Sequence, residues 1–440
     1  FNESSYVIYD TLNASLGPAT PRDFSPGKHT QLEKTFNVDF SKDIDVDMFE
    51  SLMVAGGYEW HSESFEVTAG DVASYTAGPY TEQGFGIGSN GFPGFKPQAA
   101  GVYSRQNFAF YVDTEAQITE DFLLGAALRY EDYSSFGSDS NYKLTAQYNV
   151  TDDFSLRSSI STGFRAPTVG QANYSNVQTA LENGALVDSA LLPASNPIAI
   201  QLGATELTPE TSQSYTLGAV WNIGELFITL DYYNISVEDR VSQSTKYELT
   251  DDDKTALTNA GVANVFDTTT SGVDLIANYG MELLDGDAKF SLAYNYNKTE
   301  VDSFTAITGD FKVSRLENDL PNHRATLTWS QSWDEVSFLI RGNYYGEYQG
   351  VHVDYVDTVN TGDAAVTIDA EFSYFASDDI VLSVGAQNLF DQDATEINFT
   401  DAGAASCGGC VNNQWGGKYY ETSPFGFNGG FYYVKATYNF

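Results

Sequence analysis

Few residues of this 440-residue chain are grouped in a way that could do chemistry, and the most compact group is the pair Cys407 and Cys410 in "CGGC". Their spacing fits a tight disulfide, a redox-active Cys-x-x-Cys or half of a zinc site. A redox site needs a thioredoxin-like βαβ context and zinc needs two further ligands, and the sequence around the pair offers neither. We therefore predict a disulfide that staples the last long loop in an oxidising compartment.

A second group is the acidic run "TDDDK", which contains Asp251, Asp252 and Asp253. Clustered carboxylates supply the oxygen ligands that calcium prefers, so a calcium site is one interpretation of this run. A solvated loop is the other interpretation, because the run lacks the glycine and the distal glutamate of an EF-hand loop. No other pattern in the sequence indicates a cofactor.

Aromatic side chains crowd two of the long connections. Stacking platforms for a sugar or an aromatic chelate are built from such residues, so these positions are candidate ligand contacts. The alternative is that they pack the loops against one another, and both roles can hold together. The candidates are Tyr75, Tyr80, Phe85, Phe92 and Phe95 in the first long connection, and Trp415, Tyr419 and Tyr420 in the last.

The sequence argues against several classes of function. The histidines at positions 29, 61, 323 and 352 are scattered, and no nucleophile elbow, zincin motif or phosphate-binding glycine loop is present, so we expect no enzyme. The net charge of −39 argues against nucleic acid as a partner, since neutralising phosphates needs clustered lysine and arginine. This charge fits a solubility device, adaptation to a salty habitat, or loops that attract cations.

The elements that position these residues are strands. In the last ten residues alternate positions are apolar and the positions between them are more polar, a period of two that predicts a strand. The same alternation recurs in 122–131, 142–150, 288–297 and 336–344. The apolar face of the last strand consists of Tyr432, Val434, Ala436, Tyr438 and Phe440.

Short and long connections alternate along the chain. The short ones are acidic, such as "ITEDF", "NVTDDF" and "FASDDIV", and most of the others are long. We count about 16 strands of roughly 10–14 residues, the length that crosses a bilayer when a strand is tilted. Both chain ends then lie on the short-turn side. The long connections are 63–103, 166–208, 239–270, 300–319, 348–362 and 391–428.

These features predict an all-β fold, a transmembrane antiparallel β-barrel that occupies residues 1–440. No segment approaches 18 consecutive apolar residues, so a transmembrane helix is excluded. A soluble sheet this wide would normally be covered by a helical layer, and no convincing amphipathic helix is visible. Lipid can cover the apolar face instead, if the strands close into a barrel. A soluble β-sandwich or propeller is the alternative, with shorter strands and less regular loops.

Short turns on one side and long loops on the other are how outer-membrane barrels of Gram-negative bacteria are built, so outer-membrane lipid is an expected partner. Phe440 as a terminal aromatic resembles the signal by which the barrel assembly machinery recognises such proteins for insertion. The chain starts at Phe1 with neither an initiator methionine nor a signal-peptide pattern, which predicts a mature or truncated product. Interfacial girdles would be formed by aromatics near strand ends, such as Tyr130, Tyr148, Tyr232, Tyr344 and Tyr438.

Four segments resemble TonB-dependent receptors, the gated importers of the outer membrane. "STGFRAPTVGQANY" (161–174) is similar to the Gly-Phe-Arg-Ala-Pro segment that ends an upward strand of that family before a long outer loop. "ELTPETSQSYTLGAVW" (206–221) resembles the opening of the following strand. "SGVDLIANY" (271–279) and "SVGAQNLFDQDA" (383–394) resemble later segments, so the four occur in the family's order.

The resemblance implies a 22-stranded barrel, of which this chain would supply about 16 strands. It also implies a plug domain and a segment that contacts TonB, and neither is recognisable, so we expect the C-terminal part of a receptor. The implied function is TonB-driven import of a scarce small-molecule ligand, a ferric siderophore or an oligosaccharide. A passive porin of about 16 strands is the alternative.

Arg165 is the single residue that the matched Gly-Phe-Arg-Ala-Pro segment brings forward. One interpretation is a guanidinium at the rim that pairs with carboxylates where a strand ends. The other interpretation is direct contact with the ligand.

Overall fold

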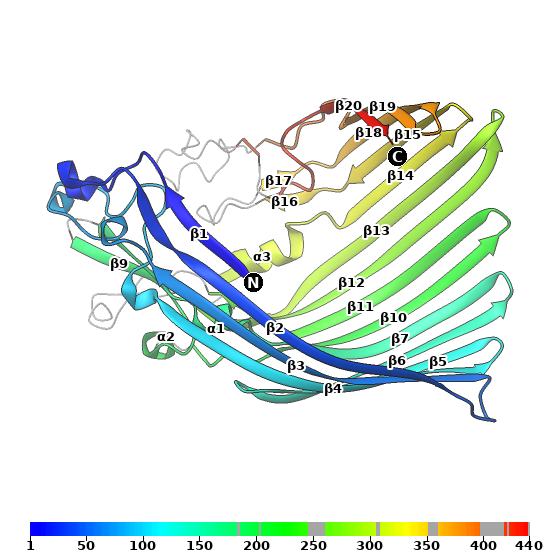
Figure 1. The fold of residues 1–440 in the computed structure, drawn as a ribbon, viewed down its shortest axis with the longest axis horizontal. Helices are drawn as coiled ribbons and strands as arrows, with labels where there is room; N and C mark the ends of the chain where they lie inside the picture. The colour runs from blue at the N-terminus through cyan, green and yellow to red at the C-terminus, as the bar shows by residue number, and fades with distance from the viewer. Residues whose placement is uncertain are drawn as a thin grey trace.

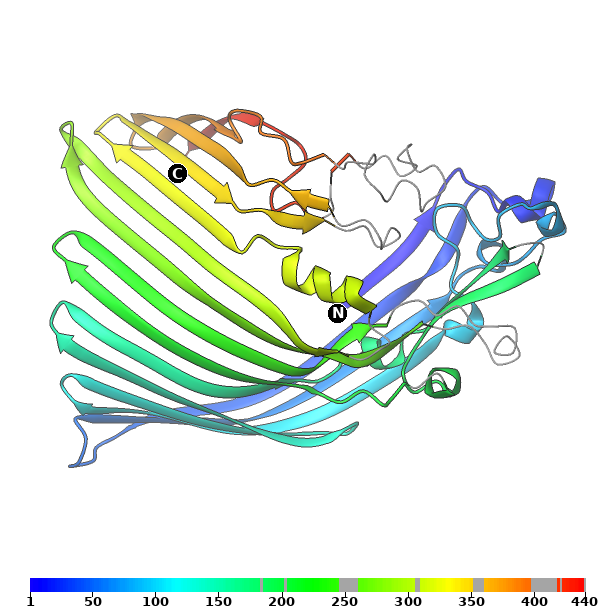
Figure 2. The same cartoon turned by 180° about the vertical axis from the view of Figure 1, so that it is seen from behind.

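The computed structural model of the chain describes residues 1–182, 185–201, 204–244, 260–304, 309–350, 360–396, 418–419 and 422–438. Long strands run obliquely side by side in a curved sheet (Figure 1), and the view from behind shows the same arrangement (Figure 2). Short turns gather at one end of the strands, which we call the turn end. The long connections and the helices gather at the other, which we call the loop end.

The described strands form a 16-stranded antiparallel sheet in which each strand pairs with its neighbour in chain order, as the sequence predicted. Its strands are β1 (Asn2–Ile8), β2 (Phe24–Ile44), β3 (Ser51–Ala69), β4 (Gly101–Thr119), β5 (Phe122–Tyr133), β6 (Gly137–Thr151), β7 (Phe154–Arg165), β10 (Glu210–Ile223), β11 (Leu226–Gln243), β12 (Ala260–Leu283), β13 (Gly286–Phe304), β14 (His323–Ser332), β15 (Val336–Tyr345), β18 (Ala365–Ser377), β19 (Ile380–Gln387) and β20 (Phe431–Tyr438).

The connections at the loop end contain the remaining elements. The hairpin of β8 and β9 joins the main sheet through a short parallel pairing of β9 with β12, and β16 pairs with β17. These elements are β8 (Asn176–Glu182), β9 (Ala185–Leu192), β16 (Tyr348–Gly350), β17 (Asn360–Gly362), α1 (Val169–Asn173), α2 (Pro197–Gln201), α3 (Gly309–Asn318), and the 3-10 helices η1 (Ala14–Ala19), η2 (Val72–Ser74), η3 (Thr81–Gln83) and η4 (Pro97–Ala99).

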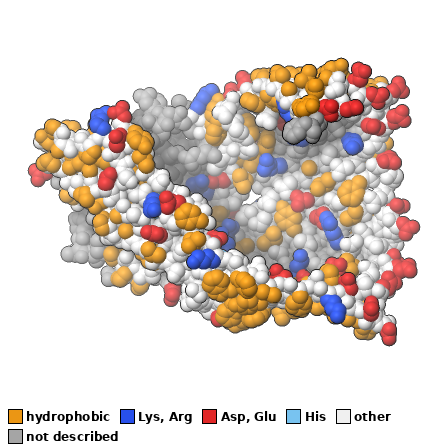
Figure 3. Space-filling view, viewed as in Figure 1, with side chains coloured by type: hydrophobic (Ala, Val, Ile, Leu, Met, Phe, Trp, Pro, Cys, Tyr) orange, Lys and Arg blue, Asp and Glu red, His pale blue; other side chains and the backbone are white. Residues whose placement is uncertain are grey.

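Two faces of the sheet follow from the register. Tyr130 lies opposite Phe110, and Leu128 opposite Val112, so one face is apolar, and we call it outward. The predicted girdle tyrosines all lie on this outward face and are exposed. The positions between them are polar and form the inward face. Figure 3 shows apolar side chains in patches on the surface, with acidic ones gathered along the turn end.

Several strands are longer than the roughly 10–14 residues that the sequence predicted. β2 has 21 residues and β12 has 24. The alternation of apolar and polar residues stops before these strands do. The outward apolar band of β2 begins at Phe36, and above it Thr30 and Lys34 occupy outward positions. Beyond the band the strands continue without this alternation, and the first residues of β12 were therefore assigned to the connection 239–270.

The helix α3 is a second departure, because its residues fall in a connection where we expected no helix. Its ten residues are too few to give a clear period, and among its described side chains Val313 and Leu316 pack against Val265 and Phe266. Among the described residues, no helix has the length and apolarity to cross a membrane.

The two ends of the main sheet do not pair with each other among the described residues. β1 pairs with β2 alone, and β20 pairs with β19 alone. Asn2 lies opposite Gln31, partway along β2, whereas Tyr438 lies opposite Ile380 at the turn end. The expectation that both chain ends lie at the turn end is therefore wrong for the first strand and right for the last.

Candidate functional site

The inward face beneath the long connections is the part of the molecule that can hold a polar ligand. Every arginine on a described strand lies in the inward register, whereas Lys28, Lys34, Lys42 and Lys298 lie in the outward one. Lipid excludes charge from the outward band, but it does not explain why arginine gathers inside. The inward strand cations are Arg105, Arg129, Lys143, Arg157, Arg165, Arg240, Lys289, Arg324, Arg341 and Lys435.

Arg105 on β4 is a buried junction between strands and loops. Its guanidinium pairs with Glu63 on β3 at 2.7 Å and donates at 2.6 Å to the carbonyl oxygen of Pro167, in the matched Gly-Phe-Arg-Ala-Pro segment. It also lies over the rings of Tyr133 and Phe136, at 5.2 and 5.6 Å from their centroids. These contacts satisfy the charge within the protein, so Arg105 holds the second long connection against the barrel wall.

A neighbouring network surrounds Glu131 on β5. Its carboxylate accepts hydrogen bonds from Tyr133 at 2.9 Å and from Arg129, and Arg129 also pairs with Glu59 at 3.4 Å. Tyr133 links this network to Arg105, whose guanidinium lies 5.2 Å from the centroid of its ring. On the β3–β5 wall, then, opposite charges pair with one another.

Opposite charges also pair on the wall from β7 to β12, but there the arginines are more exposed: Arg157 pairs with Asp231 at 2.6 Å with 49% of its side chain exposed. We call the polar groups at the loop end of this wall the mouth cluster. Arg165 pairs with Glu210 at 2.7 Å, and the same carboxylate oxygen accepts the backbone N–H of Val241 at 2.8 Å. Glu210 is buried, but the side chain of Arg165 is 61% exposed. Next to Val241, Arg240 donates at 3.3 Å to the hydroxyl of Thr268.

The helix α3 completes the mouth cluster with two cations. Its packing on Phe266, whose register is inward, places the helix over the inner side of β12 and β13. Arg315 pairs with Asp319 at 2.8 Å. Burial, reinforced by the positive charge of Arg315, lowers the pKa of Lys312. The mouth cluster is therefore made of the cations Arg165, Arg240, Lys312 and Arg315, the carboxylates Glu210, Glu317 and Asp319, and the hydroxyl of Thr268.

Phe92 and Phe95, which the sequence proposed as ligand contacts, belong to a packed aromatic cluster around His29. Phe95 is 1% exposed and its ring centroid lies 4.7 Å from that of His29. The cluster joins β1, β2, β3, the first long connection and the residue after α1, because it also contains Tyr6, Phe65 and Tyr174. These two phenylalanines hold loops together.

The other aromatic candidates of the first long connection lie at its surface. Tyr80 packs directly on Gly17, where a Cβ would collide with its ring, and it meets Phe85 edge-on at 6.3 Å. Phe85 is 48% exposed. Tyr75 is half-buried and ends the short helix η2. Of this set, Phe85 offers the most surface to a ligand.

In the last long connection, Tyr419 stacks on Phe427 at 5.7 Å and donates at 2.8 Å to Asp393. Several other candidates lie outside the described residues: Trp415, Tyr420, the cysteines Cys407 and Cys410, the acidic run Asp251, Asp252 and Asp253, and Phe440.

Sequence reasoning missed every member of the mouth cluster except Arg165, and it missed Arg105. The available signal was weak. Arg105, Arg240 and Thr268 each lie at a polar position of a strand, but the residues around Arg240 were assigned to a loop because no apolar alternation marks the strand there. The convergence of β11, β12 and α3 depends on register and on a helix that the sequence did not predict.

Comparison with known proteins identifies a family model and relatives that match this chain. The family model described as "TonB dependent receptor-like, beta-barrel" matches residues 2–389. The chain is 21% identical over 346 residues to the vitamin B12 transporter BtuB of Photobacterium profundum, covering 78% of the chain and 44% of that protein. It is 28% identical over 196 residues to the ferric enterobactin receptor PirA of Pseudomonas aeruginosa, covering 42% of the chain and 24% of that protein.

Solved structures show the same fold. The siderophore receptor PirA of Acinetobacter baumannii superposes with a TM-score of 0.64 at 14% identity, over 100% of this chain and 59% of that one. A mutant of the ferric enterobactin receptor PfeA of Pseudomonas aeruginosa gives 0.61 at 16% identity, over 89% and 53%. The chain spans less than half the length of the curated relatives above.

Proposed function

The chain belongs to the TonB-dependent receptor family, and on that premise we propose that it forms the barrel wall and outer loops of an import receptor in a Gram-negative outer membrane. The curated relatives carry the names of receptors and transporters, so we propose no catalytic role. The match covers residues 2–389, from β1 to β19, and we assign coupling to TonB to a plug that fills the barrel and lies outside residues 1–440.

We propose that the cargo is a ferric siderophore of anionic character. The observation that carries this proposal is the mouth cluster, where Arg165 on β7, Arg240 on β11 and Lys312 on α3 lie at the loop end of a chain whose net charge is −39. Arginine is suited to oxyanions because its donors are arranged in a fixed planar fork. A bound anion would also offset the burial and the repulsion from Arg315 that together lower the pKa of Lys312. Relatives named for siderophores support the same class of cargo.

An oligosaccharide receives less support. Sugar platforms need exposed aromatic faces, and the structure commits Phe92 and Phe95 to packing the loops. The passive porin is disfavoured by membership of a family of gated receptors.

Binding to the full-length receptor tests the cargo. Arg240→Ala should weaken binding of ferric enterobactin, used as an anionic probe, by about tenfold, because one charge-assisted hydrogen bond is lost. Lys298→Ala is the matched control, since Lys298 lies outward on β13 and pairs with Glu300. Tighter binding of cobalamin or a maltooligosaccharide than of any ferric chelate would overturn the siderophore proposal.

Expression provides a second test. The abundance of the receptor in outer membranes, measured by quantitative mass spectrometry, should rise under iron starvation. Induction only by a complex polysaccharide as carbon source would identify a glycan importer instead.

A further inference from the structure

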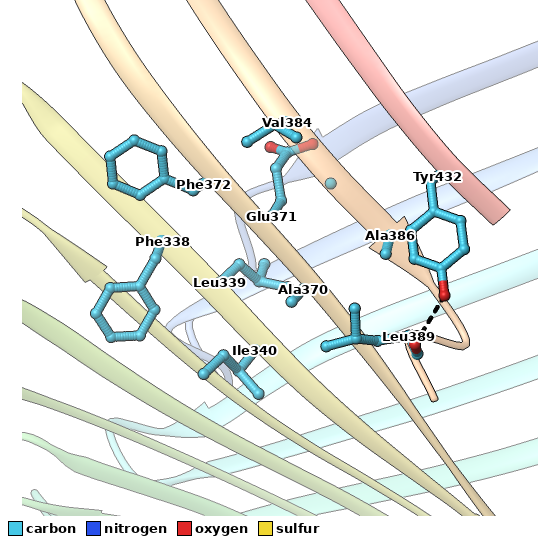
Figure 4. A pocket seen from close by; sticks show the side chains of 11 residues that line it. Phe338, Leu339, Ile340, Ala370, Glu371, Phe372, Val384, Ala386, Leu389 and Tyr432 are labelled. Atoms are coloured by element: carbon cyan, nitrogen blue, oxygen red, sulfur yellow. Dashed lines mark hydrogen bonds between the residues drawn. The ribbon is translucent and has the colours of Figure 1, made fainter. Parts of the chain in front are cut away.

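The outward face of β15, β18, β19 and β20 carries an apolar groove of about 440 Å³ that the import of a polar cargo does not use (Figure 4). We propose that this groove seats one acyl chain of lipopolysaccharide from the outer leaflet. The proposal depends on the orientation of the barrel in the membrane and not on which cargo is imported.

The groove arises from two small residues placed side by side among large ones. Ala370 and Ala386 lie directly opposite each other on β18 and β19, and Ala386 is 5% exposed. Across the four strands, the row of opposed residues that contains them is Ile340, Ala370, Ala386 and Tyr432. The next row toward the turn end is uniformly large, with Phe338, Phe372, Val384 and Val434. The alanines therefore form a floor, and the larger side chains form its walls.

The walls are held in place by hydrogen bonds that do not depend on an occupant. The hydroxyl of Tyr432 donates at 3.0 Å to the carbonyl oxygen of Leu389, as the dashed line in Figure 4 marks. The backbone N–H of Leu389 donates at 2.6 Å to the carbonyl oxygen of Ile368. On the opposite face, Tyr433 donates at 2.6 Å to Glu371, which keeps that carboxylate away from the groove.

The groove is wide enough for a single hydrocarbon chain and too narrow for an α-helix. Neighbouring strands lie about 4.8 Å apart, so the backbones of β15 and β20, which bound the floor, are separated by roughly 14 Å. The side chains of Ile340 and Tyr432 stand within that span. A helix about 10–12 Å across cannot reach the alanine floor between them, whereas a single hydrocarbon chain can.

The position of the groove selects the source of that chain. The groove is continuous with the outward apolar band, so hydrocarbon is what meets it in a membrane. Ala386 and Tyr432 lie at the loop ends of β19 and β20, and Leu389 lies in the connection that follows β19. Long loops face the cell exterior in outer-membrane barrels, so this half of the band meets the outer leaflet, where lipopolysaccharide is the acylated lipid.

Filling the floor is the direct test. The full-length receptor is extracted from native outer membranes in mild detergent, and the lipid A and phospholipid that co-purify are quantified by mass spectrometry. Ala370→Phe and Ala386→Phe should each retain about tenfold less lipid A, the factor expected when a chain loses contact for about two methylene groups. Ala126→Phe is the matched control, because Ala126 is an exposed outward residue on β5, outside the groove.

Each other result overturns the proposal. Unchanged lipid A would show that no acyl chain is seated. Loss confined to phospholipid would assign the groove to a phospholipid, and loss of a dimer on size-exclusion chromatography would assign it to a second copy of the chain. Binding of the cargo probe should stay unchanged in all variants, which separates this inference from the siderophore proposal.

A second measurement avoids enlarging the floor. Phe338→p-benzoylphenylalanine places a photoreactive group in the wall of the groove, and Leu128→p-benzoylphenylalanine places it on the outward band of β5. Illumination of intact cells should give a lipid A adduct, detected by immunoblot, from position 338 well above that from position 128. Equal adducts would mean only general contact with lipid and would overturn the proposal.

Discussion

The β2–β5 wall and the β7–β12 wall use the same residue types in opposite ways. Along β2–β5, Arg105 is buried among Glu63, Tyr133 and a loop carbonyl, and Phe95 is buried in the aromatic cluster. Along β7–β12, Arg165 keeps most of its side chain exposed although it pairs with Glu210. This difference indicates that an arginine or an aromatic residue near an outer loop can contact a ligand only where its guanidinium or its ring is accessible.

The largest expected effect tests whether the aromatic cluster is structural. Phe95→Ala should lower the free energy of unfolding by about 4 kcal/mol, because it empties a site that is 1% exposed. Phe85→Ala, at a 48% exposed position of the same connection, should cost less than about 1 kcal/mol. Thermal unfolding of the receptor in detergent, followed by circular dichroism, measures both. Similar losses of stability in the two variants would show that the buried Phe95 contributes no more to packing than the exposed Phe85.

Arg105 provides the next test. Arg105→Ala should destabilise the receptor by about 3 kcal/mol, since it leaves Glu63 and the carbonyl oxygen of Pro167 without their charged donor. The second long connection should also become more sensitive to protease, because its anchor on β4 is lost. Lys34→Ala, an outward position on β2, is the control for loss of a positive charge. Unchanged stability together with weaker cargo binding would show that Arg105 contacts the ligand and does not anchor the loop.

The sequence was sufficient for the strands that carry an apolar face, and insufficient where that face ends. Tyr130 and Tyr438 were placed correctly because lipid demands an alternation that single residues reveal. The upper part of β12 and the helix α3 lie in water, where no such demand applies. The resemblance brought Arg165 forward, but its contact with Glu210 depends on the pairing of β7 with β10 across the second long connection. The local spacing of residues in the sequence does not reveal cross-strand contacts of this kind.

Arg165 should behave differently from Arg105 although both pair with a glutamate. Arg165→Ala should change the free energy of unfolding by no more than about 1 kcal/mol, because the arginine is 61% exposed and the buried Glu210 keeps the backbone N–H of Val241 as a donor. The same variant should weaken binding of the ferric probe more than it alters stability, as judged by isothermal titration calorimetry beside thermal unfolding. A large loss of stability with unchanged affinity would show that the two walls do not differ.

The smallest expected effect is a pH dependence of stability that arises from His29 in the aromatic cluster. His29 lies on the part of β2 that extends above the apolar band, beside Phe65, Phe95 and the hydroxyl-bearing rings of Tyr6 and Tyr174. Burial lowers its pKa below the ordinary value of 6.5. Below about pH 6.5 the unfolded chain therefore binds a proton that the folded chain still refuses, so stability falls as the pH drops through this range and levels off below the folded pKa.

His29→Phe keeps a ring in the aromatic cluster and removes the titration. The difference in melting temperature between pH 7.5 and pH 5.5 should be smaller in this variant than in the wild-type receptor, since the two proteins differ only at position 29. An identical difference would mean that the imidazole of His29 takes up its proton as readily in the fold as in the unfolded chain. The aromatic cluster would then be open to water at His29. The β2–β5 wall would in that case be more accessible than its contacts indicate, and closer in this respect to the β7–β12 wall.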